Sequence, residues 1–190
     1  AAEYLDELRR KSIADLLRNH PLDCLICPKA GECRLQDLVY ALGVRNCENQ
    51  IPPVALDIDT SSPLIERNNN RCIRCGRCVS VCDEIQAAFA LKWQIQGDIR
   101  QVVPVNGYPL NCEFCGQCIA ACPVGAIGSR LFSYKARVWE LDRVSSVCPY
   151  CGAGCSIELN VRKNRILRVT SDSDATHNKG YLCYRGVFGY

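Results

Sequence analysis

The sequence lacks any apolar run that could cross a membrane, since no stretch approaches the roughly 18 apolar residues that a helical span needs. Residues 1–20 also lack the apolar core of a secretory signal peptide. Aromatic residues make up only 7% of the chain, and no basic run is interleaved with them, so the pattern typical of nucleic-acid-binding surfaces is missing. We therefore expect a cytoplasmic protein with no membrane span and no nucleic-acid partner.

A glycine-rich phosphate-binding loop is lacking as well. The G-x-G at Gly152–Gly154 stands among closely spaced cysteines and does not have the pattern of a flavin or nicotinamide site. We therefore expect no nucleotide-binding site and no catalytic residue in this chain.

Cysteine, by contrast, is abundant, with 16 residues among 190. A content this high predicts either a disulfide scaffold or a set of metal sites. Disulfide scaffolds belong to oxidising compartments, so in a cytoplasmic protein the clustered cysteines are expected to bind metal. The formal net charge of +3 counts the protein alone, and thiolate-ligated metal clusters make the total negative.

Two helices are predicted near the N-terminus. Residues 4–18 place several leucines near one helical stripe and charged residues on the other side. Pro21 ends this helix and leaves His20 at its C-terminal edge. A second, shorter helix is expected over 34–42, where Gly43 stops it.

The rest of the chain alternates between connectors and short elements. Residues 51–70 contain three prolines and a run of asparagines, which predicts an extended connector. Helical segments are expected at 79–92 and 118–127, and a strand near 99–105. Residues 156–169 alternate apolar and polar side chains around a central turn, which predicts a hairpin.

The strongest motif is an internal repeat of four cysteines with the spacing C-x₂-C-x₂-C-x₃-C, whose two copies lie 40 residues apart. In such runs three cysteines bind one [4Fe–4S] cubane and the fourth binds the other. Zinc sites usually pair two separated C-x₂-C knuckles, and neither zinc nor disulfides explain two copies of the run. One cluster is expected on Cys72, Cys75, Cys78 and Cys122, and a second on Cys112, Cys115, Cys118 and Cys82.

A third set of candidate ligands precedes the repeat. Cys24, Cys27 and Cys33 supply three thiolates, and the set lacks one ligand. His20 stands four residues before Cys24, and Cys47 follows Cys33 after 14 residues. Spacing alone leaves His20 and Cys47 as rival candidates for the fourth ligand. The alternative interpretation of His20 is an ordinary histidine at the end of a helix.

A fourth set surrounds the predicted hairpin. Cys148, Cys151 and Cys155 precede it and Cys183 follows it, so the hairpin should bring Cys183 back beside the other three. Four thiolates could bind either zinc or a cubane, and the spacing favours a cubane.

At these residues the chain resembles the iron–sulfur subunit of NADH dehydrogenase (respiratory complex I) and its relatives among NAD-linked formate dehydrogenases, electron-bifurcating [FeFe] hydrogenases and transhydrogenases. HPLDCLICPKAGECRLQD at 20–37 resembles that family's His–Cys₃ cluster motif. Residues 71–86 and 111–127 resemble its two-cluster ferredoxin module, and 147–161 with 179–190 resemble the small iron–sulfur domain of molybdopterin oxidoreductases.

The resemblance implies an α+β chain with four [4Fe–4S] clusters, three bound by four cysteines and one by His20, Cys24, Cys27 and Cys33. Cys47 is then left over as a structural thiol, and Cys148, Cys151, Cys155 and Cys183 are carried over as cubane ligands. The expected organisation is a His–Cys₃ segment at 1–50, a linker at 51–70, a two-cluster ferredoxin-like domain at 71–138 and a molybdopterin-oxidoreductase-type domain at 139–190.

The implied function is electron transfer within a hetero-oligomeric, NAD(P)-linked oxidoreductase complex of the transhydrogenase or hydrogenase type, including the electron-bifurcating kind. Expected partners are a flavin- and NAD(P)-binding subunit with further clusters, and a second redox subunit or a soluble ferredoxin. The alternative is the N-terminal cluster-binding part of an NAD-dependent formate dehydrogenase catalytic subunit. That branch has a lysine two positions after the last cysteine, where this chain has Arg185.

One hypothesis about redox tuning follows from the first repeat. Arg71, Arg74 and Arg77 each stand beside a candidate ligand, whereas the second repeat has uncharged residues at the matching places. Positive charge would make the first cluster easier to reduce. The alternative is that these arginines face solvent or a partner.

Overall fold

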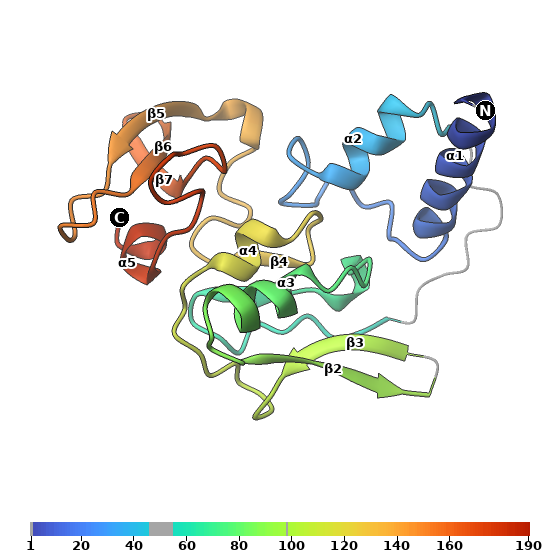
Figure 1. Cartoon of the computed structure of the whole chain (residues 1–190), viewed down its shortest axis with the longest axis horizontal. Coiled ribbons are helices and arrows are strands. Elements are labelled where there is room, and N and C mark those ends of the chain that lie inside the picture. Colours follow the sequence, from blue (N-terminus) through green and yellow to red (C-terminus); the bar gives the residue numbers. More distant parts are fainter. Residues whose placement is uncertain (1, 46–54, 98) are drawn as a thin grey trace.

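The computed structural model describes residues 2–45, 55–97 and 99–190. Figure 1 shows two helices at the N-terminus, a central unit of short helices and small sheets, and a C-terminal unit built on one sheet. This mixture of helices and small antiparallel sheets confirms the expected α+β class. Within the described parts of the chain, no helix is both long and apolar enough to cross a membrane.

The two N-terminal helices lie where the sequence predicts them. Helix α1 (Ala2–Arg18) buries Leu17 of the expected leucine stripe together with Ile13, while the other three leucines, Leu5, Leu8 and Leu16, are exposed. Helix α2 (Arg34–Ala41) buries Leu35. The turn after α1 is closed by the backbone N–H of His20, which donates to the Leu17 carbonyl at 3.2 Å. The loop between the helices therefore carries the candidate ligands of the His–Cys₃ set.

The central unit begins inside the expected connector. Strand β1 (Ile65–Arg67) pairs antiparallel with β4 (Ile127–Ser129), and a 3₁₀ turn (Asn69–Arg71) follows it. The end of the 51–70 stretch is therefore part of a sheet with a buried face. Three-residue strands about 60 positions apart leave no signal in local sequence, because their pairing is entirely non-local.

The helices that follow the two cysteine repeats are short. Helix α3 (Arg77–Ser80) continues as a π turn to Ile85, and α4 (Gln117–Ala121) is a single turn. The prediction of a helix to residue 92 is wrong, because Ala87 and Phe89 take positive φ angles that no helix continues through.

A hairpin occupies the place of that expected helix end. Strand β2 (Leu91–Gln96) pairs with β3 (Ile99–Pro104). The latter agrees with the strand expected near 99–105.

The C-terminal unit is a three-stranded antiparallel sheet of order β5–β6–β7, followed by a short helix. Strands β6 (Ser156–Arg162) and β7 (Arg165–Thr170) form the predicted hairpin, whose turn residues Lys163 and Asn164 both have positive φ as a tight two-residue turn requires. An unpredicted strand β5 (Asp142–Val147), preceded by a 3₁₀ turn (Val138–Glu140), lies along β6, and α5 (Tyr184–Phe188) packs on β7.

Two hydrophobic cores lie beneath these elements. The larger core joins the N-terminal helices to the central unit and includes the almost fully buried Ile65 and Val124. Its buried residues include Cys33 of the N-terminal set and Cys78 and Cys122 of the first central set, and three cysteines of the second central set are partly buried against it. A second, smaller core of Cys148, Ile157, Val169 and Leu182 belongs to the C-terminal unit.

Candidate metal centres

The first cysteine repeat wraps around a small cavity. Cys72, Cys75 and Cys78 line it together with Cys122 from the second repeat. The loop can turn tightly because Arg74 and Gly76 both take left-handed conformations, and the Arg74 N–H lies 3.4 Å from the Cys72 sulfur. The structure thus brings together the four cysteines that the repeat pattern assigns to one cluster.

The second repeat builds the same arrangement. Cys112, Cys115 and Cys118 line a second cavity together with Cys82, the last cysteine of the first repeat. Phe114 and Gly116 repeat the left-handed conformations, and the Phe114 N–H again lies 3.4 Å from the sulfur of the first cysteine. The exchange of the fourth cysteine between the two repeats is therefore present in the fold.

The thiols around these cavities interact electrostatically. Burial raises the pKa of Cys78 to about 12, and the neighbouring charges of Cys122 and Cys72 act in the same direction. Burial likewise raises the pKa of Cys118, and Cys115 and Cys78 add to it. Four thiolates can share such a site only with a compensating positive charge, which iron ions supply.

The His–Cys₃ set lies in the loop between α1 and α2. Cys27 and Cys33 are buried, and burial raises the pKa of both thiols, with Cys24 adding its charge at Cys33. The Nδ1 atom of His20 is buried and has no hydrogen-bond partner. Cys47, the rival ligand, falls outside the described residues.

The charge state of His20 suits a metal ligand. Burial lowers the pKa of His20 below its ordinary 6.5, and the charge of Arg71 acts in the same direction while Asp23 opposes it. The imidazole is therefore neutral near pH 7, with an electron pair available on a ring nitrogen. A buried, unpaired ring nitrogen in the same loop as three thiols is a donor set that fits an iron–sulfur cluster.

The C-terminal set gathers at one end of the β5–β7 sheet. The Cys148 N–H donates to the Cys155 carbonyl at 2.8 Å, which closes the loop that carries Cys151. Burial raises the pKa of Cys155, and the charges of Cys148, Cys151 and Cys183 add to it. The hairpin thus returns Cys183 to the other three cysteines, as the sequence predicts.

The cysteines of the described residues are all free thiols, so no disulfide competes with metal binding there. Among the same residues, no three histidine, cysteine or acidic side chains converge on a site for a single ion. Each of the two central cavities is lined by four cysteines, the ligand count of a [4Fe–4S] cluster.

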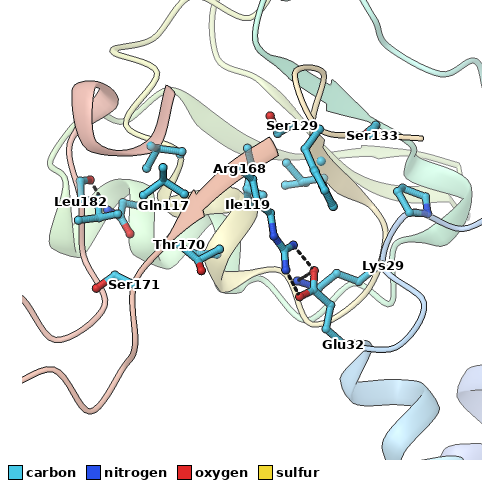
Figure 2. Close-up of a pocket in the computed structure, with 18 of the residues that line it drawn as sticks. Lys29, Glu32, Gln117, Ile119, Ser129, Ser133, Arg168, Thr170, Ser171 and Leu182 are labelled. Atoms are coloured by element: carbon cyan, nitrogen blue, oxygen red, sulfur yellow. Dashed lines mark hydrogen bonds and ion pairs between the residues drawn. The ribbon is translucent and has the colours of Figure 1, made fainter. Parts of the chain in front are cut away.

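A mainly apolar pocket without cysteine lies where the three parts of the chain meet (Figure 2). Arg168 on β7 reaches across it and donates to both carboxylate oxygens of Glu32, at 2.7 and 2.8 Å, while its guanidinium stacks on Phe132 at 4.6 Å from the ring centre. Burial raises the pKa of Glu32, but the bonds from Arg168 and the charge of Lys29 outweigh it and leave the pKa below 4.5. This ion pair ties the C-terminal sheet to the His–Cys₃ segment.

The arginines next to the first repeat do not lie where the tuning hypothesis requires. Arg71 is 3% exposed but is paired with Asp23, to which its Nε donates at 2.9 Å, beside the His–Cys₃ set. Arg74 and Arg77 are exposed. A different arginine, Arg67, lines the first cavity, and its position five residues before Cys72 gave no motif signal.

Three family models match the chain in order. The NADH-ubiquinone oxidoreductase-G iron-sulfur binding region matches residues 9–47, the ferredoxin-like domain of NADH-quinone oxidoreductase subunit 3 matches 62–128, and the molybdopterin oxidoreductase Fe4S4 domain matches 141–190.

Similar proteins include longer oxidoreductase subunits. The chain is 44% identical over its full length to the NADPH-Fe(3+) oxidoreductase subunit alpha of Geobacter sulfurreducens, and 43% identical over 97% of its length to the second NADH-quinone oxidoreductase G subunit of Rhizobium meliloti. It spans 22% of the length of each.

A solved structure shares the fold. An NAD⁺-reducing [NiFe]-hydrogenase in its H₂-reduced state matches with a TM-score of 0.64 and 26% identity, over 73% of this chain and 60% of that one. The ordered family matches confirm the resemblance that the cysteine motifs indicate. The chain therefore contains three iron–sulfur domains of the types that these models describe, in the order in which they match.

Proposed function

We propose that this chain relays single electrons through four [4Fe–4S] clusters within an NAD(P)-linked oxidoreductase complex. The observation that carries the proposal is the pair of cavities in the central unit, each lined by three cysteines of one repeat and the fourth of the other. A [4Fe–4S] cluster supplies a one-electron carrier. The chain's own residues hold the clusters, bury them and set the distances between them.

The proposed ligands form four sets. The two central sets are those that line the two cavities, the N-terminal set combines one neutral imidazole with three thiols, and the C-terminal set has four thiols. In chain order within each set they are His20, Cys24, Cys27 and Cys33; Cys72, Cys75, Cys78 and Cys122; Cys82, Cys112, Cys115 and Cys118; and Cys148, Cys151, Cys155 and Cys183.

The packing of the units supports a continuous path. Helices α3 and α4 contact each other, and the charge of Cys78 acts on Cys118, so the two central sets are neighbours. The Arg34 N–H donates to the Pro123 carbonyl at 2.9 Å, which joins the N-terminal segment to the central unit. On the other side, the buried Gln117 amide donates to the Leu182 carbonyl of the C-terminal unit. Each candidate ligand set therefore belongs to a segment that contacts a segment carrying another ligand set.

The C-terminal set is the most exposed and supports electron exchange at that end of the path. Cys151 and Cys183 are exposed there, whereas the N-terminal and first central sets each have one exposed cysteine, Cys24 and Cys75, and the second central set has none. We infer that a flavin- and NAD(P)-binding subunit meets one end, and that a second redox subunit or a soluble ferredoxin meets the other. This arrangement suits a complex of the transhydrogenase or hydrogenase type, including the electron-bifurcating kind.

A second candidate is the N-terminal cluster-binding part of an NAD-dependent formate dehydrogenase catalytic subunit. The match of 141–190 to the Fe4S4 domain of molybdopterin oxidoreductases favours it. Molybdenum or tungsten in the native complex would support this candidate, and their absence together with a flavin-containing partner would support the first.

The test is anaerobic purification of the protein from its native cell. We expect about 16 iron atoms per chain, as four cubanes require, absorbance near 400 nm, and interacting EPR signals after reduction with dithionite. Zinc in place of iron, or iron for only two clusters, would contradict the four-cluster proposal. The chains that copurify identify the complex.

A further inference from the structure

Arg67 is a buried cation without an acidic partner. Its side chain is 2% exposed, and its Nη2 donates to the Val102 carbonyl, but Nε and Nη1 are buried with no hydrogen-bond partner. No carboxylate of the described residues forms an ion pair with it, in contrast to the equally buried Arg71. A buried charge is costly unless a counter-charge or hydrogen bonds compensate it, so the guanidinium points to an anion beside it.

The guanidinium faces the first cysteine cavity. Arg67 lines that cavity with the first ligand set, Cys72, Cys75, Cys78 and Cys122. Strand alternation turns Ile65 and Arg67 to the buried side of β1. The backbone is fixed by pairing with Ile127 and by two hydrogen bonds with Asp59, at 2.8 and 2.9 Å. The cation is therefore held in place by the sheet and does not depend on a flexible loop.

The second cavity has the opposite charge. Its lining includes Glu113 and, within the described chain, neither lysine nor arginine. Glu113 is exposed, so water screens its charge more strongly than that of Arg67.

We propose that Arg67 is the built-in counter-charge of the first cluster. Together with Glu113 beside the second cluster, it gives the first cluster the higher reduction potential, so that an electron shared between the two clusters resides mainly on the first. Reduction of a cluster by one electron adds one negative charge and breaks no bond. A fixed cation with free N–H donors stabilises that extra charge, and a carboxylate disfavours it. The inference rests on the proposed function, because it needs both central clusters.

The test is an EPR-monitored redox titration of the iron-loaded protein under anaerobic conditions. Arg67→Gln keeps an amide donor for Val102 but removes the charge. We expect it to lower the higher of the two central potentials by at least a tenfold change in the reduction equilibrium, about 59 mV for one electron. Glu113→Gln should raise the lower potential by less. Both variants therefore reduce the difference between the reduction potentials of the two clusters.

Two matched variants separate charge from packing. Arg67→Lys keeps the charge and should retain most of the difference between the two reduction potentials. Arg77→Gln removes an exposed arginine next to the same cluster and should leave both potentials unchanged. If Arg67→Gln retains full iron content and the difference does not change, the inference is overturned. If Arg67→Gln does not fold, Glu113→Gln decides, and an unchanged or larger difference overturns it. Wild-type protein without two central clusters would instead overturn the proposed function.

Discussion

At the scale of single residues, the environment of each donor distinguishes a ligand from an ordinary side chain. His20 and His177 are the two histidines of the chain. His177 is exposed in a loop, whereas His20 has a buried nitrogen without a partner, a lowered pKa and three cysteines in the loop that follows it. Spacing alone did not separate His20 from Cys47, and the burial of its unpaired nitrogen is what adds physical support.

Replacement of His20 tests this assignment. We expect His20→Ala to lose its cluster, so that iron content falls by about four atoms per chain, while His177→Ala keeps full iron. His20→Cys should retain the cluster with a lower potential, because a thiolate adds negative charge to the site. Iron analysis and redox titration measure both effects. Full iron and an unchanged EPR spectrum in His20→Ala would assign the fourth ligand elsewhere.

At the scale of elements, local patterns predicted what local forces decide. The apolar stripe of α1, the stop at Gly43 after α2 and the alternation in β6 and β7 are all contained within a few residues of sequence. The pairing of β1 with β4 and the strand β2 depend on distant contacts and on unusual backbone angles at Ala87 and Phe89, so they were not predicted.

The candidate sites likewise have parts that local sequence predicts and parts that depend on distant contacts. Cysteine spacing encodes a loop that wraps one cluster, so three ligands of each set could be predicted from local sequence. The burial of Arg67 depends on β1 being paired with β4, a strand distant in sequence, so no local motif could indicate it. The pairing of Arg71 with Asp23 is similarly non-local, and it places the charge of Arg71 beside the His–Cys₃ set.

The loop between α4 and β4 contacts the His–Cys₃ segment at Gly125. A Cβ atom at Gly125 would lie 2.5 Å from the Cys27 sulfur. We therefore expect Gly125→Ala to displace Cys27 and to lower iron content by up to about four atoms per chain, with the loss confined to the N-terminal cluster. Gly128→Ala is the control, because its nearest contact is the movable Ser133 hydroxyl at 3.1 Å. EPR of the reduced proteins identifies the cluster, and loss of a central cluster instead would contradict this packing.

At the scale of the whole molecule, the Arg168–Glu32 ion pair joins segments 136 residues apart. Both side chains are largely buried, with 13% and 21% of their surface exposed. Removing either partner leaves the other charge in a poorly hydrated pocket.

We expect Glu32→Gln or Arg168→Gln to lower the opening free energy of β7 by about 1.5–3 kcal/mol, measured by amide hydrogen exchange of the iron-loaded protein. The double variant should lose less than the sum of the two single changes. Asp6→Asn breaks the exposed pair with Arg9 and is the control, with an expected change of about 0–1 kcal/mol. Additive effects in the double variant would show that the two residues act independently.

The positions of the cysteines in the two cores determine which parts of the fold we expect to unfold when iron is removed. The larger core includes Cys33, Cys78 and Cys122 among its buried residues, so removal of the clusters would leave thiol-lined cavities at its centre. The smaller core also includes a candidate ligand, Cys148, but the C-terminal unit has a three-stranded sheet whose strands pair without help from the cysteines. We therefore expect loss of iron to unfold the cysteine loops of the central unit more readily than the C-terminal sheet.

Chelation of iron under reducing conditions should accordingly unfold the molecule in part. We expect amide protection to fall to near zero in the cysteine loops over 72–82 and 112–122 and to persist over 156–170, where the backbone hydrogen bonds of the β6–β7 hairpin need no metal. Hydrogen exchange with mass spectrometry resolves the two regions, and readdition of iron and sulfide should restore the first. Equal loss in both regions would mean that the C-terminal cluster also supports its sheet, and equal retention would mean that side-chain packing alone maintains the central unit.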